Sequence, residues 1–105
     1  VITFNASAAL TQFQTDQPVY AGMDYDPTND RFLFYSGIGS QAGRIFVVTP
    51  NAGTTWDMSI LSLTGATLPA SPGAGINGRI RYIPALSGFA IAPSVTDNIY
   101  FFKVA

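Results

Sequence analysis

The chain contains no cysteine, no histidine and no glutamate. Without cysteine it has neither disulfides nor a thiolate nucleophile. Without histidine it lacks the side chain that most often acts as a general base near neutral pH and that most often binds transition metals. These absences argue against an enzyme, and we expect neither a cofactor nor a metal ion.

Charge is also scarce, because charged residues make up 10% of the chain, against roughly 25% in soluble domains generally. The five basic and six acidic residues are spread singly, so no basic stripe exists to neutralise nucleic-acid phosphates. The sequence has no apolar run of about 18 residues, the length needed for a membrane-spanning helix. Abundant Ser, Thr, Asn and Gly with few Lys or Glu favours an extracellular or secreted protein.

Strand and turn signals dominate what is present. Ten glycines, seven prolines and many Thr, Val, Ile, Phe and Tyr residues disfavour helices. At the clearest turn, Pro27 fixes φ while Asp26 and Asn29 offer side chains that cap the reversal. We therefore expect an all-β chain. The expected strands are 1–5, 20–25, 31–36, 44–49, 56–63, 79–83, 88–92 and 98–104.

Two of these strands carry bulky apolar side chains on both faces, at 31–35 and at 99–102. A sheet with one solvated face would alternate apolar and polar residues instead. Both faces of each sheet should therefore be covered, which predicts a stack of sheets.

A Tyr-Pro-Phe pattern recurs with the same spacing in the two halves of the chain, which indicates an internal repeat. Its two copies are Tyr25, Pro27 and Phe32, and Tyr82, Pro84 and Phe89. The repeat predicts two four-stranded antiparallel sheets in a single unit spanning 1–105, the first within 20–64 and the second within 78–105. The second copy lacks a fourth strand, and the segment 1–19 is expected to supply that outer strand and a linker.

The turn after the third strand of the first copy has a distinctive pattern: Thr49, Asn51, Gly53, Thr55 and Trp56. It resembles the Asp-box of sialidase-type β-propeller repeats, with Asn51 where that family has Asp. In this motif Asn51 should bond the turn backbone, Gly53 should take a positive φ, and Trp56 should pack under the hairpin. The Asp-box is a structural device, so it implies a fold and no activity.

A second resemblance covers the C-terminal part, where 77–86 followed by 97–100 looks like the final blade of kelch or galactose-oxidase-like propellers. Together the two resemblances imply that the repeats are β-propeller blades. Two blades cannot close a ring of about four to eight, so copies of the chain, a trimer with six blades above all, or other chains should complete it. The missing outer strand then comes from the N-terminus of the same chain or of a neighbour.

The catalytic machinery implied by these families is missing. Sialidases need a glutamate, and a galactose-oxidase copper centre needs histidine and cysteine, all absent here. Asp24 and Asp26 lie two apart on one strand face, at a separation close to that of glycosidase carboxylates. With Thr28 and Asp30 they also mimic the start of a calcium-binding loop, but the central glycine and the final Glu are missing. A capped turn is the favoured interpretation.

Candidate ligand-binding residues are Arg79, Arg81, Tyr82, Tyr25 and Asp24. The two arginines share a strand face, where they either meet an anionic ligand or pair with Asp24, and the ion pair is favoured. Exposed tyrosines can stack on sugars. We therefore expect a non-catalytic, lectin-like module that binds carbohydrate. The alternatives are a structural or assembly protein of a virion, fibre or surface layer, or the C-terminal piece of a larger propeller protein.

Overall fold

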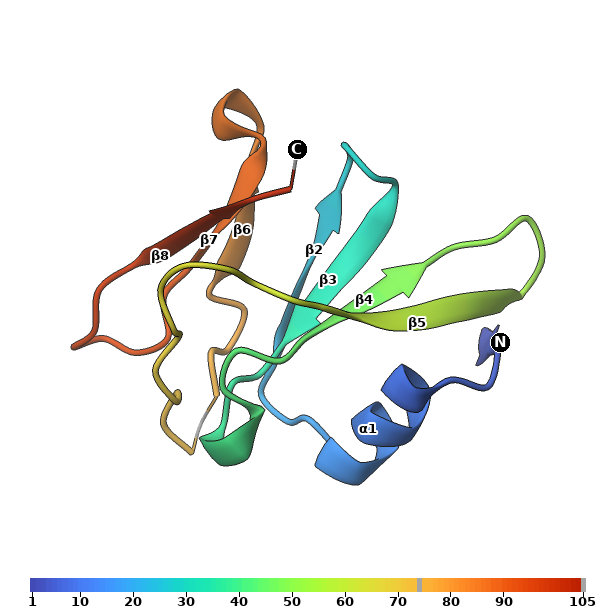
Figure 1. Ribbon diagram of the computed structural model, residues 1–105, viewed down its shortest axis with the longest axis horizontal. Coiled ribbons are helices and arrows are strands. Elements are labelled where there is room, and N and C mark those ends of the chain that lie inside the picture. The colour runs from blue at the N-terminus through green and yellow to red at the C-terminus, as the bar shows by residue number, and fades with distance from the viewer. Residues whose placement is uncertain (74, 105) are drawn as a thin grey trace.

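The computed structural model describes residues 1–73 and 75–104 and contains two β-sheets and one α-helix (Figure 1). Two short 3₁₀ segments, Gly39–Gln41 and Pro84–Leu86, lie in the connections. In chain order the other elements are β1 (Thr3–Phe4), α1 (Ala8–Asp16), β2 (Gly22–Asp26), β3 (Arg31–Tyr35), β4 (Ile45–Thr49), β5 (Thr55–Leu61), β6 (Ile80–Ile83), β7 (Gly88–Ile91) and β8 (Tyr100–Lys103).

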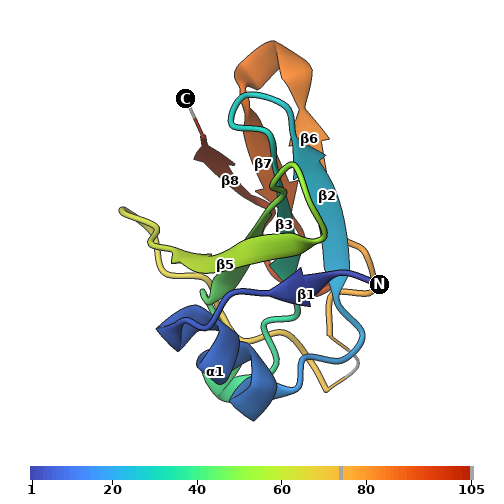
Figure 2. The ribbon, with the colours of Figure 1, turned by 90° about the vertical axis from the view of Figure 1, so that its right-hand side faces the viewer.

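The first sheet has five strands in the order β1-β5-β4-β3-β2, and the second has three in the order β6-β7-β8. Strands β2 to β5 form an antiparallel meander, as do β6 to β8. Strand β1 instead runs parallel to β5, with Thr3 opposite Thr55 and Phe4 opposite Trp56 (Figure 2). The first sheet is therefore mixed.

The expected all-β fold of two four-stranded propeller blades is wrong. The chain is an α/β protein whose two sheets differ in strand number and direction, so neither the repeat of equivalent sheets nor the ring of blades has a counterpart here. The N-terminal strand does not complete the last sheet either. Thr3 N donates to Thr54 O at 2.8 Å and Asn5 N to Trp56 O at 3.0 Å, so this segment finds its backbone partners beside β5.

Helix α1, which the sequence analysis did not expect, is defined by its two caps. Ser7 precedes it in an extended conformation and accepts a hydrogen bond from Leu10 N at 3.0 Å. At the other end Gln17 adopts a left-handed conformation and its N–H bonds Phe13 O. The helix lies beneath the first sheet (Figure 2). Its Ala9, Leu10 and Phe13 form an apolar cluster with residues of the first sheet: Phe4, Phe34, Phe46, Val48 and Met58.

The main core fills the space between the two sheets. Its buried members are Leu33, Tyr35, Ile45 and Val47 from the first sheet, Ile80, Phe89 and Ile91 from the second, and Leu68 and Ile76 from the connection between them. The first sheet is thus covered on one face by the second sheet and on the other by α1. This accounts for the bulky apolar groups on both faces of β3, with a helix in place of one expected sheet.

The connection from β5 to β6 first crosses in front of the first sheet toward β8 and then descends to the bottom of the molecule, where backbone bonds hold it (Figure 1). Ser71 N donates to Gly37 O at 2.9 Å and Asn77 N donates to Tyr20 O at 2.9 Å. The Ser71 hydroxyl, which is buried, also donates to Ser36 O at 2.7 Å. Among the residues that the structure describes, no helix is both long and apolar enough to cross a membrane.

Candidate functional site

A depression of about 310 Å³, which we call the outer groove, lies on the face of the second sheet that points away from the first. Side chains alternate between faces along a strand. Because Ile80 and Ile91 point into the core, Arg81 and Ala90 point outward. The groove is lined by Gly78, Arg79, Ile80, Arg81, Ala90, Ala92 and Ile99.

Arg79 forms a fixed wall of this groove. Its Nε donates to Ala92 O at 2.9 Å, and its Nη2 donates to Gly75 O at 3.0 Å and to Pro93 O at 3.1 Å. Three carbonyl oxygens thus hold the guanidinium in one position. The expected ion pair between Arg79 and Asp24 is wrong, because both side chains are occupied by backbone groups.

Arg81 is the exposed cation of the groove. Within the described part of the chain, the ion pairs are Arg31 with Asp26 and Arg44 with Asp16, each at 2.9 Å. No carboxylate there neutralises Arg81. Its guanidinium therefore presents a planar fork of N–H donors to solvent, which suits bidentate recognition of a carboxylate.

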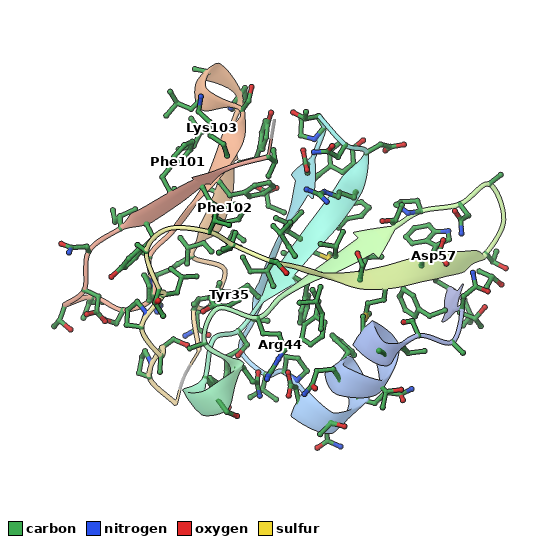
Figure 3. All side chains as sticks on the ribbon, in the orientation of Figure 1. Tyr35, Arg44, Asp57, Phe101, Phe102 and Lys103 are labelled. Carbon is green, nitrogen blue, oxygen red and sulfur yellow. The ribbon has the colours of Figure 1, made fainter. Side chains whose placement is uncertain are left out.

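Phe101 extends the exposed face beyond the groove. The strand register places Arg81 opposite Ala90 and Ala90 opposite Phe101, so these three side chains form a row across the sheet. Phe101 and Phe102 project from opposite faces of β8 (Figure 3). The Phe101 ring lies over Gly88, where an added Cβ would be 2.5 Å from Phe101 Cζ. This outer face therefore has an apolar centre with a cation at one end.

Three of the predicted binding residues lie elsewhere, at or near the meeting of β2 and β6. Asp24 accepts hydrogen bonds from Tyr82 N at 2.7 Å and from Tyr25 N at 2.9 Å. The Tyr82 hydroxyl is 3.1 Å from the Thr28 hydroxyl. Asp24 and Tyr82 thus join the two sheets and are not available in the groove.

Tyr25 is exposed on the face of the first sheet that carries α1. Its hydroxyl donates to Asp30 at 2.5 Å, and this hydrogen bond to a carboxylate raises the pKa of the phenol. Its ring packs against Phe32, with centroids 5.2 Å apart. The structure therefore brings Arg79 and Arg81 together and separates them from Tyr25.

The Asp-box-like segment forms the turn between β4 and β5. Asn51 donates to Thr55 O at 3.0 Å and to Asp57 at 3.1 Å, and the Trp56 indole donates to Gly53 O at 3.0 Å. The expected positive φ of Gly53 is wrong, because this glycine does not adopt a left-handed backbone conformation. Thr49 lies in β4 opposite Asp57.

Asp57, which the sequence analysis did not single out, is the centre of this region (Figure 3). It accepts hydrogen bonds from the Asn5 amide at 2.8 Å and from Asn51. These two bonds, the one from Asn5 first, lower the pKa of its carboxyl. The Thr3 and Thr55 hydroxyls, 3.0 Å apart, add a second contact between β1 and β5. The polar side chains of this region are thus engaged with one another and with the turn backbone.

Each of the six aspartates accepts at least one hydrogen bond within the described chain. The engaged pairs are Asp16 with Arg44, Asp24 with Tyr82, Asp26 with Arg31, Asp30 with Tyr25, Asp57 with Asn5, and Asp97 with Ser94. Asp26 is buried and also accepts from Thr28 N at 3.0 Å, so the candidate calcium loop is a capped turn. Within 1–73 and 75–104, no three acidic, His or Cys side chains are grouped for a metal.

A larger depression of about 400 Å³ lies where β4 begins and β5 ends. Its charged side chain is Arg44, whose Nη1 is 2.9 Å from Asp16 Oδ2. The remaining lining comes from Ile60 and Leu61 of β5, from Ala42 and Gly43 before β4, and from uncharged residues of the connection that follows β5. Because its cation is already neutralised, this depression offers less for recognition than the outer groove.

No protein-family model, no curated protein and no solved structure matches the chain. The resemblances noted in the sequence therefore have no independent match.

Proposed function

We propose that the protein is a non-catalytic binding module that takes an acidic carbohydrate in the outer groove. The observation that carries this proposal is the exposed Arg81 guanidinium, which has no carboxylate partner among the described residues and stands beside a floor of Ala90 and Ala92. A sugar ring with a carboxylate has an apolar C–H face and a planar anion. The alanine floor suits the apolar C–H face, and the guanidinium suits the planar anion.

The neighbouring groups favour a preformed site. Arg79 is immobilised by three carbonyl oxygens, and the floor residues belong to β7 or follow it directly. A binding site on rigid elements loses little conformational entropy when the ligand arrives. Ile99, which is 71% exposed, stands at one side of the groove and would lose solvent contact against the sugar.

The proposal excludes catalysis by this chain's own side chains. Histidine, cysteine and glutamate are absent, and each aspartate accepts a hydrogen bond from another group of the described chain. General acid–base work on a sugar needs a carboxylic acid and a carboxylate facing each other across the substrate. An extracellular location is part of the proposal and is supported by composition alone.

The test is binding of the whole chain to oligosaccharides that contain uronic or sialic acid and to neutral oligosaccharides of the same length. We expect the acidic ligands to bind and Arg81→Gln to weaken them about tenfold or more, because a hydrogen-bonded charge contributes about 1.5–3 kcal/mol. Lys103→Gln is the matched control, since it removes one positive charge from the outer side of the same sheet but outside the groove.

Equal losses in the two variants would show that non-specific electrostatics drives binding, and equal binding of neutral ligands would contradict the role of the carboxylate. Absence of binding to every sugar would remove the proposal. A structural or assembly role is then the second candidate. The observation that favours it is the low charge of the chain, in which 10% of the residues are charged.

A further inference from the structure

A tight turn precedes β6 at the rim of the outer groove. Asn77 and Gly78 adopt left-handed conformations in it, with φ of 46° and 80°, and Arg79 N donates to Ile76 O at 2.9 Å. A hydrogen bond across two central residues of positive φ is typical of a type I′ turn, for which Asn-Gly is a favoured pair. Gly78 also lines the groove, so a chemical change in this turn is a change in the groove.

Asn-Gly is also the dipeptide in which an asparagine side chain reacts most readily with its own main chain. The amide nitrogen of the glycine attacks Cγ of the asparagine, and ammonia leaves with the proton of that amide, which closes a five-membered succinimide ring. Glycine favours this step because it has no Cβ to block the approach. Water then opens the ring at one of its two carbonyls and leaves a carboxylate, in either an aspartate or an isoaspartate linkage. The reaction consumes water, releases ammonia and needs no enzyme.

The structure leaves both reacting groups of this turn accessible. Asn77 and Gly78 are exposed, and no described group bonds the side-chain amide of Asn77 or the N–H of Gly78. A Cβ added at Gly78 would meet nothing within 4 Å. The main chain of the turn is restrained by the bond from Arg79 to Ile76 and by a bond from Asn77 N to Tyr20 O at 2.9 Å. The reaction in the folded protein should therefore be slower than in the unfolded chain.

The other four asparagines are each followed by a residue that has a Cβ. These pairs are Asn5-Ala6, Asn29-Asp30, Asn51-Ala52 and Asn98-Ile99. The side-chain amides of Asn5, Asn29 and Asn51 also donate to aspartate oxygens, at 2.8, 2.9 and 3.1 Å. Asn77 should therefore react before the others.

We propose that Asn77 is a site of spontaneous deamidation, and that the carboxylate formed there lowers the affinity of the outer groove for acidic sugars. The new charge lies next to Gly78 and two residues before Arg79, both of which line the groove. Two residues span at most about 7 Å of chain, which is within the screening length of about 8 Å at physiological ionic strength. The effect on affinity rests on the proposed function, whereas the modification itself does not.

The two products differ in what they do to the fold. The aspartate product keeps the main chain of the turn and changes its charge. The isoaspartate product adds one carbon to the main chain between Asn77 and Gly78, where the packing is close: a Cβ at Gly22 would lie 2.8 Å from Gly78 Cα. We therefore expect the isoaspartate product to loosen the contact between β2 and β6 as well.

Ageing of the whole chain in mildly alkaline buffer tests the modification. Peptide mass spectrometry should find conversion at Asn77 first, and ion-exchange chromatography should show a new, more acidic species. Asn77→Gly is the control, because glycine accepts the left-handed turn but has no side chain to react. Conversion at Asn77 no faster than at Asn5 and Asn51 would overturn the proposal. So would an acidic species that forms equally fast in Asn77→Gly.

The variant Asn77→Asp carries the charge of the aspartate product and tests its effect on the groove. We expect it to bind an acidic oligosaccharide about threefold more weakly than the wild type, because the added carboxylate repels that of the ligand. Gln14→Glu is the matched control, since it adds the same charge at an exposed position of α1. Wild-type affinity in Asn77→Asp, or an equal loss in both variants, would overturn the effect on the groove.

The two arms separate this proposal from the proposed function. If the wild type binds no acidic sugar, the proposed function fails together with the effect on affinity. Mass spectrometry of the aged chain still decides whether Asn77 is the site of modification.

Discussion

The carboxylate of Asp24 accepts a hydrogen bond from the backbone amide of Tyr82 at 2.7 Å and thereby connects the edge strands of two different sheets. The Tyr82 N–H points away from β7, because residues 81 and 90 form the neighbouring hydrogen-bonded pair of that ladder. Without Asp24 this amide would lack a partner at a part-buried position. One side chain thus closes an edge of the second sheet and fixes its position against the first.

Asp24→Ala is therefore expected to destabilise the protein by about 1–3 kcal/mol, the cost of leaving a part-buried donor unsatisfied. Asp24→Asn keeps an acceptor oxygen and should cost clearly less. Equilibrium urea unfolding measures both. Tyr82→Phe is the control, because it removes the contact of the hydroxyl with Thr28 but keeps the amide bond. If Tyr82→Phe lowers the free energy of unfolding as much as Asp24→Ala does, the hydrogen bond from the Tyr82 amide to Asp24 is not the dominant contact between the two strands.

The close approach of the same two strands requires glycine at position 22. A Cβ there would lie 2.7 Å from Ile80 Cγ2 and 2.8 Å from Gly78 Cα. Gly22→Ala should therefore push β2 and β6 apart and cost about 1–3 kcal/mol of the free energy of unfolding. Gly53→Ala is the matched substitution, because its Cβ meets nothing within 4 Å and the backbone is not left-handed. It should be neutral, and a comparable loss there would contradict the argument.

Local patterns predicted the strands well and their arrangement poorly. Each of the eight expected strands overlaps an observed one, because β-branched and aromatic runs bounded by turn residues are a local signal. The segment 8–16 was missed because its nine-residue sequence is only weakly amphipathic. Its helix depends on the Ser7 cap and on packing against Phe46, and that contact is non-local. The parallel pairing of β1 with β5 is non-local as well.

The candidate site was predicted only in part, again because local patterns do not reveal contacts with distant segments. Alternation along the strand correctly placed Arg79 and Arg81 beside one another, because this relationship lies within one segment. It did not show that three backbone carbonyls hold Arg79, or that Asp24 is occupied by Tyr82. Those partners come from other segments. The prediction that both faces of each sheet are covered is wrong for the second sheet, whose outer face is exposed at Phe101.

Acid should weaken the fold through Asp26. Burial raises the pKa of this carboxyl, but hydrogen bonds from Asn29 and Arg31 together outweigh it, so that the pKa lies below its ordinary value. A depressed pKa means that the stabilisation is complete above the unfolded-state value of about 3.9 and is lost as pH falls through the folded value. Urea midpoints measured between pH 7 and pH 2 should therefore decrease below about pH 4.

Asp26→Asn tests the origin of this acid sensitivity. It should cost about 2–4 kcal/mol at pH 7, because Arg31 loses its buried partner, and it should flatten the slope below pH 4. Asp57→Asn is measured beside it, since the hydrogen bonds from Asn5 and Asn51 lower that pKa too. A slope unchanged in the Asp26 variant but lost in the Asp57 variant would assign the effect to Asp57.

Phe13 holds α1 against the first sheet, and its removal tests the helical layer directly. Its ring makes edge-to-face contacts with Phe46 and Phe34, at centroid distances of 5.1 and 5.6 Å. A nine-residue helix is too short to persist in water by itself. Phe13→Ala should therefore cost about 3 kcal/mol and remove most of the helical signal in far-UV circular dichroism. The exposed neighbour Gln14→Ala should leave both unchanged, and a helical signal that survives Phe13→Ala would mean that packing on the sheet does not maintain α1.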